Sequence, residues 1–88
     1  MLEFTRKINN KIGLHLRAAG ELVKVAAQFT SNITVYNGDQ SANGKSILGL
    51  ASLAAARGAL LRIEIDGPDD EAARRALETL FDNNFYED

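Results

Sequence analysis

Cysteine and tryptophan are absent from the 88 residues of the chain, and histidine, proline and methionine occur once each. Without cysteine the chain has neither a disulfide framework nor a thiolate ligand, and one histidine is too few for a zinc site. No apolar run approaches the ~20 residues of a membrane span, and the N-terminus lacks the charged and apolar regions of a signal peptide. We therefore expect a soluble cytoplasmic protein that holds no metal and no cofactor.

An excess of basic residues is lacking too, because 10 Lys and Arg stand against 12 Asp and Glu, for a net charge of −2. Nucleic-acid binding needs a basic surface, so this charge argues against it, and we expect no membrane binding either. With 45% hydrophobic residues the chain is typical of globular proteins. Its length predicts a single domain over residues 1–88, which we expect to be a monomer.

The spacing of apolar residues predicts the element order β-α-β-β-α-β-α. The strands are expected at residues 2–8, 33–36, 40–42 and 61–66, and the helices at 16–29, at 46–55 and from residue 69 or 70 to the end. The short third strand follows a tight turn at residues 37–39, which favours an edge position. Asp69 or Asp70 is expected to cap the last helix. This order favours an α+β fold, an open-faced β-sandwich of one four-stranded antiparallel sheet with three helices on one face.

The single histidine stands where a loop is expected to become a helix. The stretch reads Gly13-Leu14-His15-Leu16-Arg17-Ala18-Ala19. His15 is therefore expected at or beside the N-cap, just ahead of the free backbone amides of Leu16, Arg17 and Ala18, which favour an anion. A neutral imidazole is a nucleophile near neutral pH, and the Arg17 guanidinium offers planar, bidentate donors. These residue types suit a phosphoryl group carried on His15, whereas the alternative is a polar cap residue on a surface helix.

A second stretch of interest runs from Asn43 to Leu50 and contains Ser46 at the expected start of a short helix. Ser46 is a good N-cap residue. The helix is apolar nearly all round, so a small domain leaves one side exposed as a contact surface. That side is predicted to consist of Ile47, Leu48 and Ala51. A nucleotide-binding P-loop is rejected, because that motif needs glycine five positions before Gly44, where Asp39 stands.

Together these stretches resemble a known family. Residues Gly13–Ala19 are similar to the active-site signature of the HPr family, the histidine phosphocarriers of the bacterial phosphotransferase system. Asn43–Leu50 resembles a second signature of that family, and Gly67–Ala73, which leads into the closing helix, resembles it as well. The resemblance covers essentially the whole chain. It implies the same open-faced sandwich and a carrier that performs no small-molecule turnover alone and is therefore not an enzyme.

The resemblance also implies partners. His15 would accept a phosphoryl group from Enzyme I and pass it to IIA-type acceptors, with Arg17 beside it. Ser46 matches the serine that a dedicated HPr kinase/phosphorylase modifies in many bacteria. The surface expected to meet these partners consists of Leu16, Gly20, Lys24, Ile47, Leu48 and Ala51.

Two positions depart from the usual family pattern, since Leu16 replaces alanine and Ala18 replaces proline. Ala18 thereby restores an amide that proline lacks. The tail Phe81–Asp88 resembles the nitrogen-related branch of carriers, so the carbohydrate and nitrogen-related systems both stay open. One alternative is a regulatory module in which phosphorylated Ser46 recruits a partner while His15 is idle. Another is an α+β interaction domain whose motifs are accidental.

Overall fold

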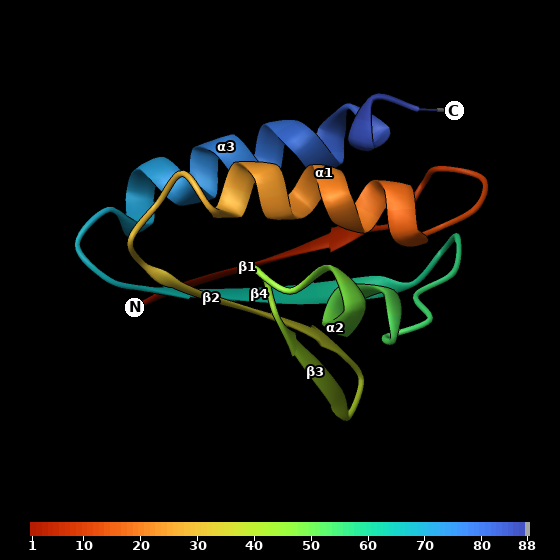
Figure 1. Cartoon of the computed structure of the whole chain (residues 1–88), viewed down its shortest axis with the longest axis horizontal. Helices are drawn as coiled ribbons and strands as arrows, with labels where there is room; N and C mark the ends of the chain where they lie inside the picture. Colours follow the sequence, from red (N-terminus) through yellow and green to blue (C-terminus); the bar gives the residue numbers. More distant parts are fainter. Residues whose placement is uncertain (88) are drawn as a thin grey trace.

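The computed structural model describes residues 1–87 and contains one four-stranded antiparallel sheet in the order β1-β4-β2-β3 (Figure 1). The elements are β1 (Leu2–Lys7), α1 (Leu16–Ala26), β2 (Asn32–Asn37), β3 (Gln40–Asn43), α2 (Ile47–Ala51), β4 (Leu60–Asp66), α3 (Asp70–Asp82) and a short turn η1 (Asn84–Tyr86). The predicted α+β open-faced sandwich is confirmed, including the edge position of the short third strand.

Side chains alternate between the two faces of the sheet, and β4 supplies its centre. In the register of the strands Ile63 lies opposite Phe4 of β1 and opposite Val35 of β2. Ile63 and Val35 are fully buried, whereas their polar neighbours Arg62 and Glu64 are only partly covered. Because successive residues of a strand point to opposite faces, the helices cover the apolar face and leave a polar one open.

The two long helices, α1 and α3, run side by side across the covered face, and α2 packs beside α1 and β3 (Figure 1). Each long helix buries one stripe. The buried residues of α1 are Ala18, Ala19, Leu22 and Ala26, and those of α3 are Ala73, Leu77, Leu80 and Phe81. No helix among residues 1–87 is both long enough and apolar enough to cross a membrane.

Both α1 and α2 are shorter than their apolar spacing predicts. α1 ends at Ala26 rather than Phe29, because the amides of Gln28 and Phe29 bond only three residues back and tighten the chain into a turn. α2 ends at Ala51 rather than at residue 55. Ala54 adopts a φ of 50°, which takes the chain out of the helix.

The predicted capping of α3 by an aspartate side chain is wrong. Asp69 does occupy the N-cap position, but its carboxylate makes no hydrogen bond to the helix that follows. It accepts instead from the amides of Thr30 (2.8 Å) and Ser31 (3.0 Å) and from the Ser31 hydroxyl. The hydrogen bond from the Ser31 hydroxyl, followed by that from the Thr30 amide, lowers the pKa of Asp69 to about 2. The carboxylate thus joins the loop after α1 to the start of α3.

Candidate functional site

The loop before α1 is held in place by its contacts with the segment before β4. Gly13 has a φ of 81°, and a Cβ atom at this position would lie 2.4 Å from the carbonyl oxygen of Ala55. The backbone conformation and the close approach therefore both require glycine here. The next residue, Leu14, is buried and donates its amide to that same Ala55 carbonyl at 2.8 Å. These contacts fix the position from which His15 begins the helix.

His15 occupies the N-cap of α1, as the sequence predicts. Its carbonyl accepts the first helical hydrogen bond, from Ala19 at 2.8 Å, but its side chain does not cap the helix. Within residues 1–87, the amides of residues 16–18 have no hydrogen-bond acceptor. The first turn also has no acidic residue. The helix start therefore keeps its partial positive charge and its donors for another anion.

The ring of His15 contacts a residue that the sequence analysis missed. His15 Nε2 lies 2.8 Å from Oε1 of Glu87, at the far end of the chain. The buried Asn10 donates its side-chain amide to the same carboxylate oxygen at 2.7 Å and to the Gly13 carbonyl at 2.7 Å. A carboxylate only accepts hydrogen bonds, so the ring proton lies on Nε2 and the neutral ring keeps its lone pair on Nδ1.

The charge state of Glu87 follows from the same contacts. Burial tends to raise the pKa of this carboxyl, but hydrogen bonds from His15 and Asn10 and the nearby charge of Arg17 outweigh it. The pKa of Glu87 therefore lies below its usual range. The group is ionised near neutral pH, as the assignment of the ring proton requires.

The tail reaches His15 through an uncommon backbone turn. Asn84, Phe85 and Tyr86 have φ values of 53°, 58° and 59°. The left-handed region costs a residue other than glycine about 1–2 kcal/mol. Phe85 offsets part of this cost, because its side chain is buried and meets the ring of Phe81 edge-on with a centroid separation of 4.9 Å. The only sequence signal for this contact is a pair of aromatic residues, Phe85 and Tyr86, just beyond the helix.

His15 lines a shallow pocket of about 210 Å³. The other lining residues are Lys11, Ile12, Arg17 and Glu87. Of the residues that the structure describes, two cationic side chains and one carboxylate thus surround the ring, and the free amides of the helix start lie next to it. This charge pattern suits a dianion such as a phosphoryl group. No group of three metal-ligating side chains that could hold an ion occurs within residues 1–87.

The predicted partner surface is only partly exposed. Leu16 is 58% exposed, Leu48 75% and Ile47 40%, and Ile12, which the sequence analysis missed, is 70% exposed. These side chains belong to the start of α1, the loop before it and α2, and the two helices pack against each other.

The remaining predicted contact residues are less accessible or already paired. Ala51 is half-buried rather than exposed, because its helix is short and lies close to α1. Gly20 is also half-buried. Lys24 is exposed and lies 3.2 Å from the carboxylate of Glu21, one turn earlier in α1.

Ser46 is the N-cap of α2, and its hydroxyl oxygen accepts the amide of Gly49 at 3.1 Å. The residue is half-buried and directly precedes the exposed Ile47. Its capping role is therefore confirmed, and its modification stays a prediction.

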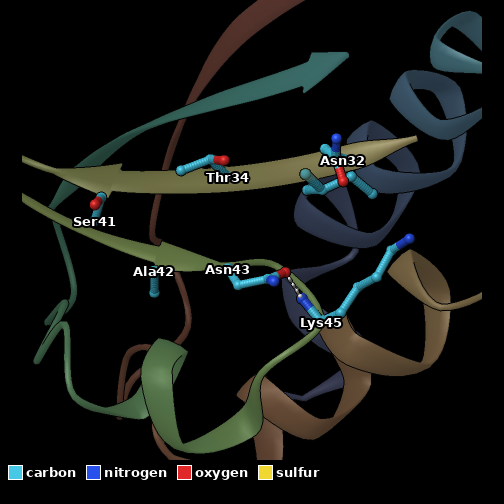
Figure 2. A pocket seen from close by; sticks show the side chains of 7 residues that line it. Asn32, Thr34, Ser41, Ala42, Asn43 and Lys45 are labelled. Atoms are coloured by element: carbon cyan, nitrogen blue, oxygen red, sulfur yellow. Dashed lines mark hydrogen bonds between the residues drawn. The ribbon is translucent and has the colours of Figure 1, made fainter. Parts of the chain in front are cut away.

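A larger hollow of about 340 Å³ lies at β2 and β3 (Figure 2), and it shares no lining residue with the pocket at His15. Its lining residues are Asn32, Ile33, Thr34, Ser41, Ala42, Asn43 and Lys45. The lysine is the only charged side chain among them, and its ammonium group donates to the carbonyl of Phe29 at 2.7 Å. This hollow contains no nucleophile paired with a base, so the pocket at His15 is the better candidate site.

The chain is similar over its whole length to known phosphocarrier proteins. The family model described as "PTS HPr component phosphorylation site" matches residues 2–83. The chain is 44% identical over 88 residues to the phosphocarrier protein HPr of Xylella fastidiosa (strain Temecula1), covering 100% of this chain and 99% of that protein. It is 45% identical over 87 residues to the phosphocarrier protein HPr of Neisseria meningitidis serogroup A, covering 99% and 98%. The crystal structure of HPr-C-His from Thermoanaerobacter tengcongensis has a TM-score of 0.94 and 39% identity, covering 100% and 99%.

Proposed function

Since this chain belongs to the HPr family, the phosphocarriers of the phosphotransferase system, we propose that His15 is the residue that carries the phosphoryl group. The observation that carries the proposal is the setting of its ring. The side chain is 27% exposed, precedes three amides without acceptors, and has Nε2 engaged by Glu87. Nδ1 is then the nitrogen with a lone pair for phosphorus.

The transfer needs no group beyond the two proteins and the phosphoryl group. The Nδ1 lone pair forms a bond to phosphorus while the bond from phosphorus to the donor breaks, and its electron pair leaves with the donor. The amides of residues 16–18 and the Arg17 guanidinium supply hydrogen bonds and positive charge to the phosphoryl oxygens. In the next step the P–N electron pair returns to Nδ1 and the phosphoryl group passes to the acceptor.

We further propose that Enzyme I is the donor and that IIA-type proteins are the acceptors, both docking on the same surface. Its exposed apolar part is Leu16, Ile47 and Leu48, with Gly20, Lys24 and Ala51 at less exposed or more polar positions. Large apolar side chains that remain exposed beside a reactive group favour a protein partner. A pocket of only about 210 Å³ favours a small group presented by such a partner.

Ser46 is proposed as a second modification site, for a kinase of the HPr kinase/phosphorylase type. Its hydroxyl begins α2 beside the exposed Ile47 and Leu48, so a phosphate here would place charge at the edge of the docking surface. The alternative in which phosphorylated Ser46 recruits a partner while His15 is idle uses the same geometry. The two differ only in whether His15 is labelled.

The deciding experiment is incubation with Enzyme I and labelled phosphoenolpyruvate. We expect acid-labile label on the wild-type chain and none on His15→Ala or His15→Gln. The glutamine variant is the better control, because its amide can still donate to Glu87 and the change in stability should stay within about 1 kcal/mol. Label on a folded His15→Gln protein would rule out His15 as the carrier. An unlabelled wild-type chain that a kinase modifies at Ser46 would favour the regulatory alternative.

A further inference from the structure

We infer that Glu87 is a positioning residue for the phosphoryl transfer: its carboxylate keeps the ring proton on Nε2 of His15 and balances the positive charge that the ring gains when Nδ1 is phosphorylated. This inference rests on the proposed role of His15. It goes beyond that role, because it assigns a function to a side chain 72 residues away in the sequence.

Glu87 is built into the site rather than lying loosely on it. Its side chain is 13% exposed and that of His15 is 27% exposed, so the pair is partly shielded from water. One oxygen, Oε1, accepts from both His15 (2.8 Å) and Asn10 (2.7 Å). Asn10 is fully buried, and its other hydrogen bond goes to the loop carbonyl of Gly13. The buried Phe85 holds the tail two residues before the carboxylate.

The charges around the ring divide into two functions. Lys11 and Arg17 line the same pocket and offer positive charge to the phosphoryl oxygens. These cations would also oppose a positive ring. Among residues 1–87, Glu87 is the only anionic side chain that lines the pocket, and it contacts the ring at Nε2. The Nε2–H bond points away from Nδ1, so the carboxylate can compensate the ring without lying against the phosphoryl group.

The positions of the ring proton and of the P–N electron pair explain why this contact matters both when the phosphoryl group binds and when it leaves. When Nδ1 bonds to phosphorus, the ring still carries its Nε2 proton and becomes cationic, and a neighbouring carboxylate stabilises that cation. When the phosphoryl group leaves, the P–N electron pair returns to Nδ1 and the ring departs as neutral imidazole. A ring without the Nε2 proton would have to depart as imidazolate, a far poorer leaving group. A carboxylate that orients a histidine and stabilises its cationic form does the same in hydrolytic triads.

The test is Glu87→Gln, which keeps an oxygen that accepts from Nε2 but removes the charge. We expect the rate of phosphoryl transfer from Enzyme I to His15 to fall about tenfold to hundredfold, at or below the lower end of what a positioned acid or base contributes. Asp39→Asn is the matched control, since it removes one carboxylate at the exposed turn between β2 and β3. Its transfer rate should equal that of the wild type.

A second readout separates positioning from simple loss of structure. The ¹⁵N chemical shifts of the His15 ring should show one neutral form, with the proton on Nε2, in the wild type and a mixture of both forms in Glu87→Gln. Unchanged rates and ring shifts in Glu87→Gln, with transfer still lost in His15→Gln, would overturn this inference and leave the proposed function intact. Faster transfer in Glu87→Gln would also overturn it, because the carboxylate would then hinder the ring. Label on His15→Gln would instead remove the proposed function itself.

Discussion

The first turn of α3 carries two carboxylates, Asp70 and Glu71, whereas the first turn of α1 carries none and has Arg17 instead. In α3 the helix supplies the negative charge that its own N-terminus favours. In α1 no acidic side chain balances the positive N-terminus, and the amides of residues 16–18 have no acceptor within residues 1–87. Both helices pack side by side on the same sheet, so packing on the sheet does not explain why their first turns differ in charge.

The N-cap side chains differ in the same sense. Neither Asp69 nor His15 caps its own helix. Asp69 is hydrogen-bonded to the loop at residues 30–31 and therefore contributes to the structure. Within the described residues 1–87, His15 is hydrogen-bonded at one nitrogen only, by Glu87, and its other nitrogen is available. The start of α3 therefore contributes to the fold, whereas the start of α1 keeps free donors, as the proposed phosphoryl site requires.

Adding an acid to α1 should have the largest effect. Arg17→Glu makes the first turn of α1 resemble that of α3, and we expect phosphoryl acceptance to fall on the order of 10²-fold, the usual loss when one charge-stabilising donor is removed. The helix itself should be unchanged or more stable by about 0.3–1 kcal/mol, because the acid suits its N-terminus. Transfer rates and thermal unfolding measure the two effects. Arg17→Lys keeps the charge but loses the planar fork, so its loss should be smaller. Transfer at the wild-type rate by Arg17→Glu would show that an acid in the first turn of α1 does not impair phosphoryl acceptance.

An acid at the start of α2 should have a smaller effect. Ser46→Asp keeps a good N-cap residue, so the fold should not change. It places one negative charge beside Ile47 and Leu48, where a partner that binds Arg17 through acidic residues would be repelled. We expect acceptance from Enzyme I to slow by about 1–2 kcal/mol, or roughly 5–30-fold, the scale of an exposed charge mismatch. Raising the salt concentration should recover part of the rate, because exposed charges are screened over ~10 Å at 0.1 M.

The control for this charge is Ser41→Asp, at an exposed position on the edge strand β3. It should transfer at the wild-type rate. Equal slowing in both variants would trace the effect to net charge, and no slowing in either would leave Ser46 as a helix cap only.

Removing a single amide should have a smaller effect still. Ala18→Pro deletes one of the free donors of α1 at a position where proline is compatible with a helical first turn. If this amide binds the phosphoryl group, the phosphohistidine should transfer or hydrolyse about threefold faster, as expected for a hydrogen bond of roughly 0.5–1 kcal/mol. Ala72→Pro is the control for proline at the corresponding position of α3, where the alanine is exposed rather than buried as Ala18 is. Equal phosphohistidine lifetimes in wild type and Ala18→Pro would show that the amide plays no part.

The fold could be predicted because its signals are local and repeated. Alternation along β4 and the helical spacing in α1 and α3 each extend over several residues, so the element order and the sheet edge follow from the sequence. The ends of α1 and α2 could not be predicted, because apolar spacing does not mark where the backbone tightens into a turn or leaves the helical conformation. α2 stops early where the chain turns so that the carbonyl of Ala55 can accept the amide of Leu14. Nothing in the apolar spacing of residues 46–55 reports that acceptor.

The candidate site also has one part that the sequence predicts and one part that it does not. His15, Arg17 and the amides at residues 16–18 lie within one turn, so the helix start alone brings them together. Glu87 reaches the ring only through the left-handed turn at Asn84–Tyr86 and the packing of Phe85 on Phe81. Neither feature has a periodic pattern. A carboxylate in a short polar tail has many possible places, and only the packed structure selects one of them.

Removing the carboxylate of Asp69 tests whether the start of α3 contributes to stability alone, and we expect no effect on phosphoryl transfer. The start of α3 lies near the C-terminal end of α1 (Figure 1). Asp69 binds the loop that follows this end, whereas His15 is at the N-cap of α1, so Asp69→Asn should accept phosphoryl groups at the wild-type rate. Its stability should fall instead. The pKa of Asp69 is about 2 in the folded chain against a usual 3.8, chiefly because the Ser31 hydroxyl donates to it. A lowered pKa means that the ionised carboxylate stabilises the fold above about pH 4, and this contribution is lost as the pH falls toward 2. The melting temperature of Asp69→Asn should therefore lie below that of the wild type at neutral pH, and the two should converge between pH 4 and 2. A constant difference across that range would show that packing, rather than ionisation, makes Asp69 stabilising.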